Sequence, residues 1–329
     1  MKPKETRVLK GANPPSAEGF FLPGNLLGIK ELTAKHIEEV LNRASHYKKQ
    51  RTLSNPKSDE LKGRKVVNLF FESSTRTRTS FELAAKDLSA DLTSITPQAT
   101  SLTKGETLKD MAQTLDAMGA DLLIVRHAAS GVPGLIAQYS RGAIINAGDG
   151  SHEHPTQALV DLFTVREIHG SIQGLHLLIV GDLAYSRVAR SNIYGFLKMG
   201  AKVTCVGPAT LIPPGLPTLG VKVGTNLDEE LPKADIVMLL RIQKERQETL
   251  NFPSLSEYTR FWGLTQDRLP LLKKETLIMH PGPINRGLEI DPQIADHRGG
   301  GNARTVILDQ VTNGIAVRMA VLSLWGVQA

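Results

Sequence analysis

The stretch KVVNLFFESSTRTRTSFE, residues 65–82, joins an apolar segment to a cluster of hydroxyl and guanidinium side chains. Its first seven residues are typical of a buried parallel strand, and the polar cluster is predicted to begin a helix. The first N–H groups of a helix lack intrahelical partners and lie at the positive end of its dipole, so this junction favours an anion such as phosphate. Three hydroxyls, from Ser74, Thr75 and Thr77, add further donors. Arg76 adds a planar fork that can bind two oxygens of one anion.

A helix start capped by hydroxyls, with arginines in solvent, would give the same local pattern, so these residues alone leave both interpretations open. Arg76 and Arg78 are two positions apart and face nearly opposite sides of a helix. We therefore assign Arg76 to the anion and Arg78 to a structural or interdomain role. No G-x-x-x-x-G-K-[ST] sequence occurs, and Gly181 stands alone where a dinucleotide site has three glycines. We expect no nucleotide cofactor, and indeed no cofactor at all.

Composition narrows the class of protein. The chain has 329 residues, 41% of them hydrophobic, which is enough for two domains. Its net charge of +6 fits small anionic substrates better than nucleic acid, because aromatic residues are 5% and no basic run exceeds two residues. Cys205 is the single cysteine, so no internal disulfide can form. With neither a secretory signal nor a membrane span expected, these features predict a cytoplasmic protein that has no membrane partner.

Strand-like and helix-like segments alternate on both sides of the opening stretch. Near-continuous apolar strands that alternate with helices indicate parallel sheets covered on both faces. Each half of the chain supplies several such units, so we expect two α/β domains that divide near residues 146–150. Further strands are predicted at residues 120–127, 142–150, 174–182, 201–208, 234–241 and 275–283, and further helices at 31–50, 108–119, 154–170, 185–200 and 305–326.

Five motifs follow one another in a specific order. They are SSTRTRTSFE (73–82), RH (126–127), HPTQALVDLFT (154–164), RIQKER (241–246) and HPGPINR (280–286). From about residue 20 to the C-terminus, the chain resembles the catalytic chains of the aspartate carbamoyltransferase family. The first motif and HPTQ also occur in ornithine carbamoyltransferases, whereas RIQKER and HPGPINR favour aspartate. The S-M-G and H-C-L-P signatures of the ornithine enzymes are missing.

The resemblance implies a fold and a reaction. The fold would be two doubly wound parallel-sheet α/β domains, with the C-terminal helix packing back on the first. Residues 1–150 with 306–329 would bind carbamoyl phosphate, and residues 151–305 would bind L-aspartate. The enzyme would transfer the carbamoyl group to the amine of L-aspartate. The products would be N-carbamoyl-L-aspartate and phosphate, in an early step of pyrimidine synthesis.

The resemblance also assigns residues to carbamoyl phosphate. As the amine attacks, negative charge grows on the carbonyl oxygen, and donors placed there stabilise the transition state more than the ground state. Four residues are the expected catalytic groups: Arg76, Thr77, Arg126 and His154. The binding residues implied are Ser74, Thr75, Arg76, Thr77, Arg126, His154, Gln157, Gly282 and Pro283. Within HPGPINR, the Gly282–Pro283 bond is a candidate cis peptide.

The aspartate site is expected in the second half of the chain. Arg187 and Arg241 each follow a strand, at the edge where open α/β sheets bind ligands, and a guanidinium fork suits a carboxylate. The resemblance implies that both bind aspartate, together with Gln243 and Lys104.

The resemblance further implies contributions from loops. Glu245 and Arg246 would hold the two domains closed on the substrates. Lys104, with Ser101, would enter the active site of a neighbouring chain, so the active unit would be a homotrimer with shared sites.

Other interpretations stay open on the sequence. The acceptor could be another amine such as ornithine, although a cationic acceptor would need carboxylates where this chain has arginines. A non-catalytic scaffold of the same fold is a further alternative. His152 and His154 could suggest a metal, but they lack a recognisable ligand spacing, so no metal is expected. Regulatory or dihydroorotase-like chains in a larger assembly are also compatible with the sequence.

Overall fold

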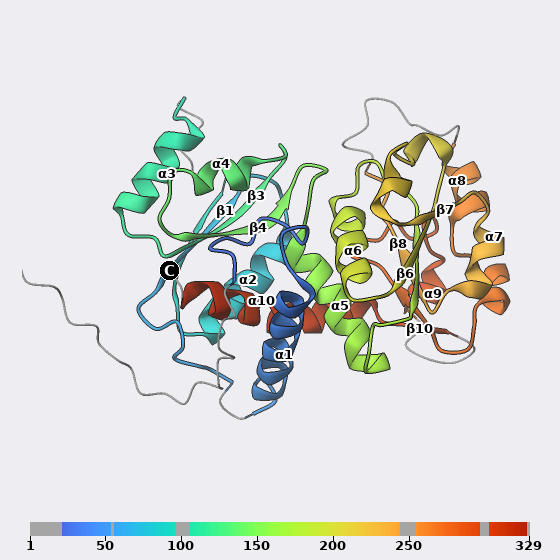
Figure 1. The fold of residues 1–329 in the computed structure, drawn as a ribbon, viewed down its shortest axis with the longest axis horizontal. Coiled ribbons are helices and arrows are strands. Elements are labelled where there is room, and N and C mark those ends of the chain that lie inside the picture. Colours follow the sequence, from blue (N-terminus) through green and yellow to red (C-terminus); the bar gives the residue numbers. More distant parts are fainter. Residues whose placement is uncertain (1–21, 54–55, 97–104, 244–253, 297–302, 328–329) are drawn as a thin grey trace, which may run out of the picture.

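The computed structural model describes residues 22–53, 56–96, 105–243, 254–296 and 303–327. The chain forms two lobes, each built around a sheet (Figure 1). The first sheet has four strands in the order β2-β1-β3-β4, and the second has six in the order β10-β9-β8-β5-β6-β7. Every strand pair within the two sheets is parallel. The predicted pair of parallel α/β domains is confirmed.

The first lobe follows the predicted alternation. Strands β1, β3 and β4 are buried along most of their length, because helices cover the sheet. Two elements were not predicted: β2 is a largely polar edge strand, DLTSI, and α4 is a six-residue helix that contains Pro133 and Gly134. The elements are β1 (Lys65–Phe70), β2 (Asp91–Ile95), β3 (Leu122–His127), β4 (Ala143–Asp149), α1 (Ala34–Gln50), α2 (Thr75–Asp87), α3 (Leu108–Ala117), α4 (Val132–Ala137) and α5 (Pro155–His169).

The second lobe keeps its apolar strands at the centre of the sheet. The three-residue edge strands β7 and β10 were not predicted, since they are too short to show a pattern. The strands are β5 (His176–Val180), β6 (Lys202–Val206), β7 (Lys222–Gly224), β8 (Ile236–Leu239), β9 (Thr276–Met279) and β10 (Ala303–Thr305). The helices are α6 (Arg187–Lys198), α7 (Leu227–Glu230), α8 (Leu255–Trp262), α9 (Pro292–Asp296) and α10 (Ile307–Gly326), with 3-10 turns at Ala209–Leu211, Leu216–Leu219, Leu231–Lys233 and Gln266–Leu271.

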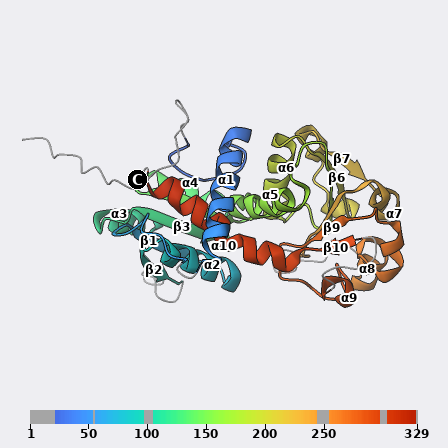
Figure 2. The same ribbon diagram turned by 90° about the horizontal axis from the view of Figure 1, so that it is seen from below.

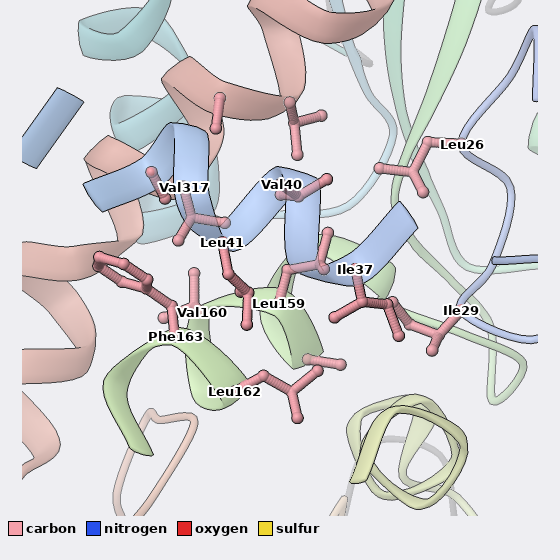
Figure 3. Packing of buried hydrophobic residues seen from close by; sticks show 14 of the residues in the cluster. Leu26, Ile29, Ile37, Val40, Leu41, Leu159, Val160, Leu162, Phe163 and Val317 are labelled. Atoms are coloured by element: carbon pink, nitrogen blue, oxygen red, sulfur yellow. The ribbon is translucent and has the colours of Figure 1, made fainter. Parts of the chain in front are cut away.

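The C-terminal helix α10 packs back on the first lobe, as predicted. It runs from the side of the second sheet to the first lobe (Figure 2) and contacts α1, α2 and α5. Val317 of α10, Leu41 of α1 and Phe163 of α5 share one buried apolar cluster (Figure 3). At its end, the buried Trp325 donates from Nε1 to the carbonyl of Pro23 at 2.8 Å. The three helices therefore join the two lobes through a common core.

Length and composition alone would allow α10 to cross a membrane, the one such helix among the described residues. The helix is instead a core helix, since 72% of its most apolar window is buried inside the protein. Its inward-facing polar groups also find partners: Asn313 Nδ2 donates to Thr164 Oγ1 at 3.0 Å. Burial between α1, α2 and α5 accounts for its apolar composition.

Candidate active site

A cleft of about 1380 Å³ lies at the carboxyl ends of strands from both sheets. Segments that follow β1, β3 and β4 line it from one side, and segments that follow β5, β8 and β9 line it from the other. Open parallel sheets bind ligands at this edge. The predicted site residues in the described ranges all line the cleft: Ser74, Thr75, Arg76, Thr77, Arg126, His154, Gln157, Arg187, Arg241, Gln243, Gly282 and Pro283. Lys104, Glu245 and Arg246 lie outside the described residues.

The start of α2 forms one wall of the cleft. Ser74 is the N-cap residue, with an extended backbone, and its side chain makes no capping hydrogen bond. Thr75, Arg76 and Thr77 make up the first turn, which contains no acidic residue. The positive end of the helix dipole is therefore not neutralised by its own first turn, and its N–H groups are suited to an anion.

Arg76 approaches the loop after β9 from this helix. Gly282 has φ +64°, and a Cβ at this position would lie 2.3 Å from Nη1 of Arg76. The Gly282–Pro283 peptide is cis, as the sequence allows. Burial and the charge of Arg241 lower the pKa of Arg76. A bound anion would act in the opposite direction, because it stabilises the charged guanidinium group. Arg78 instead lies 3.6 Å from Glu82 along the same helix, which agrees with its structural assignment.

Two predicted arginines from different lobes share one carboxylate. Glu72 Oε2 lies 2.6 Å from Nη2 of Arg187 and 3.2 Å from Nε of Arg126. Glu72 is the acidic side chain among the described residues that line the cleft. Its role was not predicted from the sequence, although it stands near the middle of residues 65–82. Buried arginines need a counter-ion, and this need could have pointed to an acidic residue such as Glu72 near the predicted arginines.

A glycine allows these two arginines to lie so close to the end of β4. Gly148 has φ +114°, and a Cβ there would lie 2.9 Å from Nε of Arg187 and 3.3 Å from Nη1 of Arg126. Nearby carbonyls complete the arrangement: Arg126 Nη1 donates to Ala147 at 3.2 Å, and Arg187 Nη1 donates to Gly150 at 3.4 Å. The backbone at the end of β4 thus holds both guanidinium groups.

The start of α5 is fixed from the second lobe. The backbone N–H of the buried His154, the N-cap residue, donates to Ser191 Oγ of α6 at 2.9 Å. The Ser191 hydroxyl in turn donates to Glu153 Oε2 at 2.7 Å, and burial raises the pKa of Glu153. One turn after His154, Gln157 donates from Nε2 to Asp161 Oδ1 at 2.8 Å. His154 and Gln157 consequently face the cleft from one rigid helix start.

Arg241 and Gln243 follow β8 and lie beside each other, with Nη2 of Arg241 3.5 Å from Oε1 of Gln243. Asp182, fully buried after β5, holds their segment in place. Its Oδ2 accepts from the backbone N–H of Gln243 at 3.2 Å, and its Oδ1 accepts from that of Tyr185 at 3.0 Å. Asp182 therefore aligns the loops after β5 and β8.

His280, which sequence analysis did not single out, lines the cleft at the end of β9. Its Nδ1 accepts from the backbone N–H of Gly282 at 2.8 Å. Burial, with added repulsion from Arg76 and Arg241, lowers the pKa of His280 to about 3. The ring is thus neutral near pH 7, and its tautomer carries the proton on Nε2.

Within the described ranges, no group of three or more His, Cys, Asp or Glu side chains is arranged to hold a metal ion. His152, considered above as a ligand, lies 3.1 Å from Asp149 through Nδ1. The charge of the cleft comes from arginines, namely Arg76, Arg126, Arg187, Arg241, Arg286 and Arg318. Such a cleft suits small ligands with several negative charges.

Comparisons with known proteins agree on one family. The model of the aspartate/ornithine carbamoyltransferase carbamoyl-P binding domain matches residues 24–167, and that of the Asp/Orn binding domain matches residues 173–325. The aspartate carbamoyltransferase catalytic subunits of Acetivibrio thermocellus and Syntrophobacter fumaroxidans are each 52% identical to this chain. The first match covers 91% of this chain and 95% of the relative, and the second covers 93% and 99%.

Solved structures give the same result. The aspartate transcarbamoylase of Trypanosoma cruzi in complex with N-(phosphonacetyl)-L-aspartic acid has a TM-score of 0.81 at 29% identity, over 91% of this chain and 94% of that one. The ornithine carbamoyltransferase of Pyrococcus furiosus has a TM-score of 0.79 at 26% identity, over 91% and 96%. The two scores are so similar that the fold defines the family but does not choose the acceptor.

This chain belongs to the aspartate/ornithine carbamoyltransferase family. Within that family, relatives at about half identity are aspartate carbamoyltransferase catalytic subunits, and the predicted enzymatic function, carbamoyl transfer to L-aspartate, is confirmed. The motifs RIQKER and HPGPINR had favoured the same acceptor.

Proposed function

We propose that this cleft transfers the carbamoyl group of carbamoyl phosphate to the amine of L-aspartate, giving N-carbamoyl-L-aspartate and phosphate for pyrimidine synthesis in the cytoplasm. The observation that supports this most is the convergence of Arg76, Arg126, Arg187 and Arg241 on one cleft. Carbamoyl phosphate and aspartate each bring two negative charges. A site for these two ligands together needs several guanidinium groups and few carboxylates, and this cleft has that composition.

The phosphate subsite is proposed at the start of α2. Ser74, Thr75 and Thr77 would donate from backbone N–H groups and hydroxyls, and Arg76 would bind two phosphate oxygens with its fork. As the bond to the carbamoyl carbon breaks, charge grows on the leaving phosphate. Arg76 would therefore act on the transition state as well as on binding. We assign residues 1–150 with 306–329 to this carbamoyl-phosphate domain.

The carbamoyl group would lie next to the phosphate, between α2, β3 and α5. Donors from Thr77, Arg126 and His154 would surround its carbonyl oxygen, which becomes negative when the amine attacks. The side-chain oxygen of Gln157 would accept from the carbamoyl NH₂. In the loop after β9, the carbonyls of Pro281 and Gly282 would accept from the carbamoyl NH₂ and from the attacking amine.

Aspartate would enter from the second domain, residues 151–305. Arg187 and Arg241 would each bind a carboxylate, with Gln243 beside Arg241. Both guanidinium groups already face the same cleft as Arg76, so the amine of aspartate can be brought toward the carbamoyl carbon.

We further propose that the active unit is a homotrimer. Lys104 of a neighbouring chain would complete the aspartate site, and Glu245 and Arg246 would hold the domains closed over the substrates. Closure would exclude water, which strengthens each electrostatic contact in the cleft.

The experiment that tests the acceptor is a rate assay of the purified protein with carbamoyl phosphate and either L-aspartate or L-ornithine. We expect phosphate release that depends on aspartate, with N-carbamoyl-L-aspartate as product, and no reaction with ornithine above the uncatalysed rate. Faster turnover with ornithine would contradict the assignment of Arg187 and Arg241 to carboxylates.

A further inference from the structure

One buried carboxylate, that of Asp161, has no role in the proposed mechanism but accepts hydrogen bonds from two residues that line the cleft, Gln157 and Gln310. Asp161 is fully buried on α5, one turn beyond Gln157. Its Oδ1 accepts from Gln157 Nε2 and from Gln310 Nε2 of α10, each at 2.8 Å. Its Oδ2 accepts from Asn192 Nδ2 of α6 at 2.8 Å. Three side-chain amides from three helices thus turn their NH₂ groups toward the same acid.

An ionised carboxylate can accept hydrogen bonds but cannot donate one, so it determines which end of each amide faces it. Burial raises the pKa of Asp161 to about 6, while the three amides and the charge of Arg318 oppose this rise. The group is accordingly ionised at pH 8. With its NH₂ turned toward Asp161, the side chain of Gln157 has its oxygen left for the cleft that it lines.

The second amide extends the same constraint to the loop after β9. Because Gln310 gives its NH₂ to Asp161, its Oε1 can accept from the backbone N–H of His280, at 3.0 Å. His280 Nδ1 then accepts from the N–H of Gly282 at 2.8 Å. A chain of hydrogen bonds therefore runs from Asp161 to the loop whose carbonyls are proposed to face the substrates.

We propose that Asp161 is a positioning residue that sets the specificity for the carbamoyl NH₂ group, by fixing the amide of Gln157 with its oxygen toward the substrate. This inference rests on the proposed function, because it concerns the same subsite. Asp161 itself does not touch the substrate. Its effect is to make the cleft present an acceptor, rather than a donor, to an amino group.

The test compares two stable ligands that differ at one group. Phosphonoacetamide carries the NH₂ of carbamoyl phosphate, and acetonylphosphonate has a methyl group in its place. Their Kd values are measured by calorimetry at pH 8 on the purified enzyme, with inorganic phosphate as a reference. We expect the wild-type enzyme to prefer phosphonoacetamide by about tenfold, the effect of one well-formed hydrogen bond.

The decisive variant is Asp161→Asn, which keeps the size of the side chain but can donate. The amides of Gln157 and Gln310 can then turn, and the preference for phosphonoacetamide should be lost, while the Kd for phosphate stays within about twofold. Gln157→Ala should lose the same preference, and the double variant should lose no more than either single variant, as expected for residues that act as one unit.

Asn192→Ala is the matched control, because it removes a partner of the same carboxylate through Oδ2 and leaves the Oδ1 contacts of both glutamines. It should lower the unfolding temperature and keep the ligand preference. Loss of preference in this control would show that any damage to the network suffices, and would overturn the positioning role. Retention of the wild-type preference in Asp161→Asn would overturn it too.

A second measurement does not depend on a variant that folds. Neutron diffraction from the deuterated wild-type enzyme with phosphonoacetamide should place the amide deuterons of Gln157 toward Asp161 and its oxygen toward the ligand. The opposite orientation would overturn the inference. If the wild-type enzyme bound neither phosphonoacetamide nor acetonylphosphonate, both the proposed function and the positioning role of Asp161 would fail. The results with the variants test the role of Asp161 alone.

Discussion

Glu72 and Arg187 form an ion pair across the cleft, with 2.6 Å between Oε2 and Nη2, although they follow strands of different sheets. Arg187 is only 4% exposed, so its charge depends on this partner. The same carboxylate oxygen lies 3.2 Å from Nε of Arg126. Glu72 thus holds Arg187, which is proposed to bind aspartate, and Arg126, which is proposed to bind the carbamoyl group, in fixed relative positions before any substrate is bound.

Replacing Glu72 by Ala should raise the KM for aspartate by about tenfold and lower kcat, because Arg187 would lose its position along with its counter-ion. Glu72→Asp, which keeps the charge with a shorter reach, should give a smaller change. Steady-state kinetics with each substrate varied in turn would measure this. A lower KM for aspartate in Glu72→Ala would mean that Glu72 competes with the substrate rather than aligning its ligand.

Arg76→Ala should lower kcat/KM for carbamoyl phosphate by about 10²-fold or more, as the loss of a transition-state donor does. The control is Arg78→Ala, two residues along the same helix, where the side chain lies near Glu82 and away from the cleft. That variant should keep kcat/KM within a few fold of the wild-type value. Equal losses in both variants would indicate a general effect on α2 instead of a phosphate contact.

Gly148→Ala should nearly abolish activity, because its Cβ would lie 2.9 Å from Arg187 and 3.3 Å from Arg126 and would displace them. The backbone itself also disfavours a side chain at φ +114°. Gly170→Ala is the matched control: its φ is +76°, but no atom lies within 4 Å of the added Cβ. Both variants should lose some thermal stability, and only Gly148→Ala should lose turnover.

His280 should make stability depend on pH. Its pKa is about 3 in the folded protein and about 6.5 when unfolded, so its contribution to stability is present above pH 6.5 and is lost as the pH falls toward 3. Between pH 7 and pH 5 this loss is about 2 kcal/mol. His280→Asn cannot titrate, yet it offers an oxygen to the N–H of Gly282. Urea unfolding at the two pH values should therefore show a smaller loss in the variant, and an equal loss would contradict the assignment.

The proposed shared site predicts complementation. Chains with Lys104→Ala and chains with Arg76→Ala should each be nearly inactive, since each lacks one part of every site. In a mixed trimer, one junction joins a chain that has Arg76 to a neighbour that has Lys104. Dissociating and reassociating the mixture should consequently restore activity. Background activity in trimers whose mixed composition is confirmed by mass would show that Lys104 serves its own chain.

Much of the fold could be predicted from local sequence. The central strands are buried on both faces, so they appear as near-continuous apolar runs such as KVVNLFF and HLLIV. The edge strands could not be predicted, because β2 is polar and partly exposed and β7 and β10 have three residues each. The length and apolar character of α10 suggested a helix, but only its contacts with α1, α2 and α5 distinguish a core helix from a membrane span.

Local sequence patterns were enough to predict which chemical groups this protein brings to a ligand. Hydroxyls and Arg76 at a strand–helix junction predict an anion site from local geometry, and the five ordered motifs predict the family. From their local sequence alone, Arg187 and Arg241 would be interpreted as surface residues. The packing of the two lobes, which no local pattern predicts, turns the carboxyl edges of both sheets toward one cleft, where these arginines meet Arg76.

The partners that hold these groups likewise follow from tertiary packing, and local sequence does not predict them. Glu72 lies 115 residues from Arg187, and Asp161 lies 149 residues from Gln310. Contacts at such separations leave no periodic pattern in the sequence, because they depend on how helices and loops pack after the chain has folded. Each of these pairings contributes to stability, because a charge or an amide that is buried away from water must find a partner within the protein.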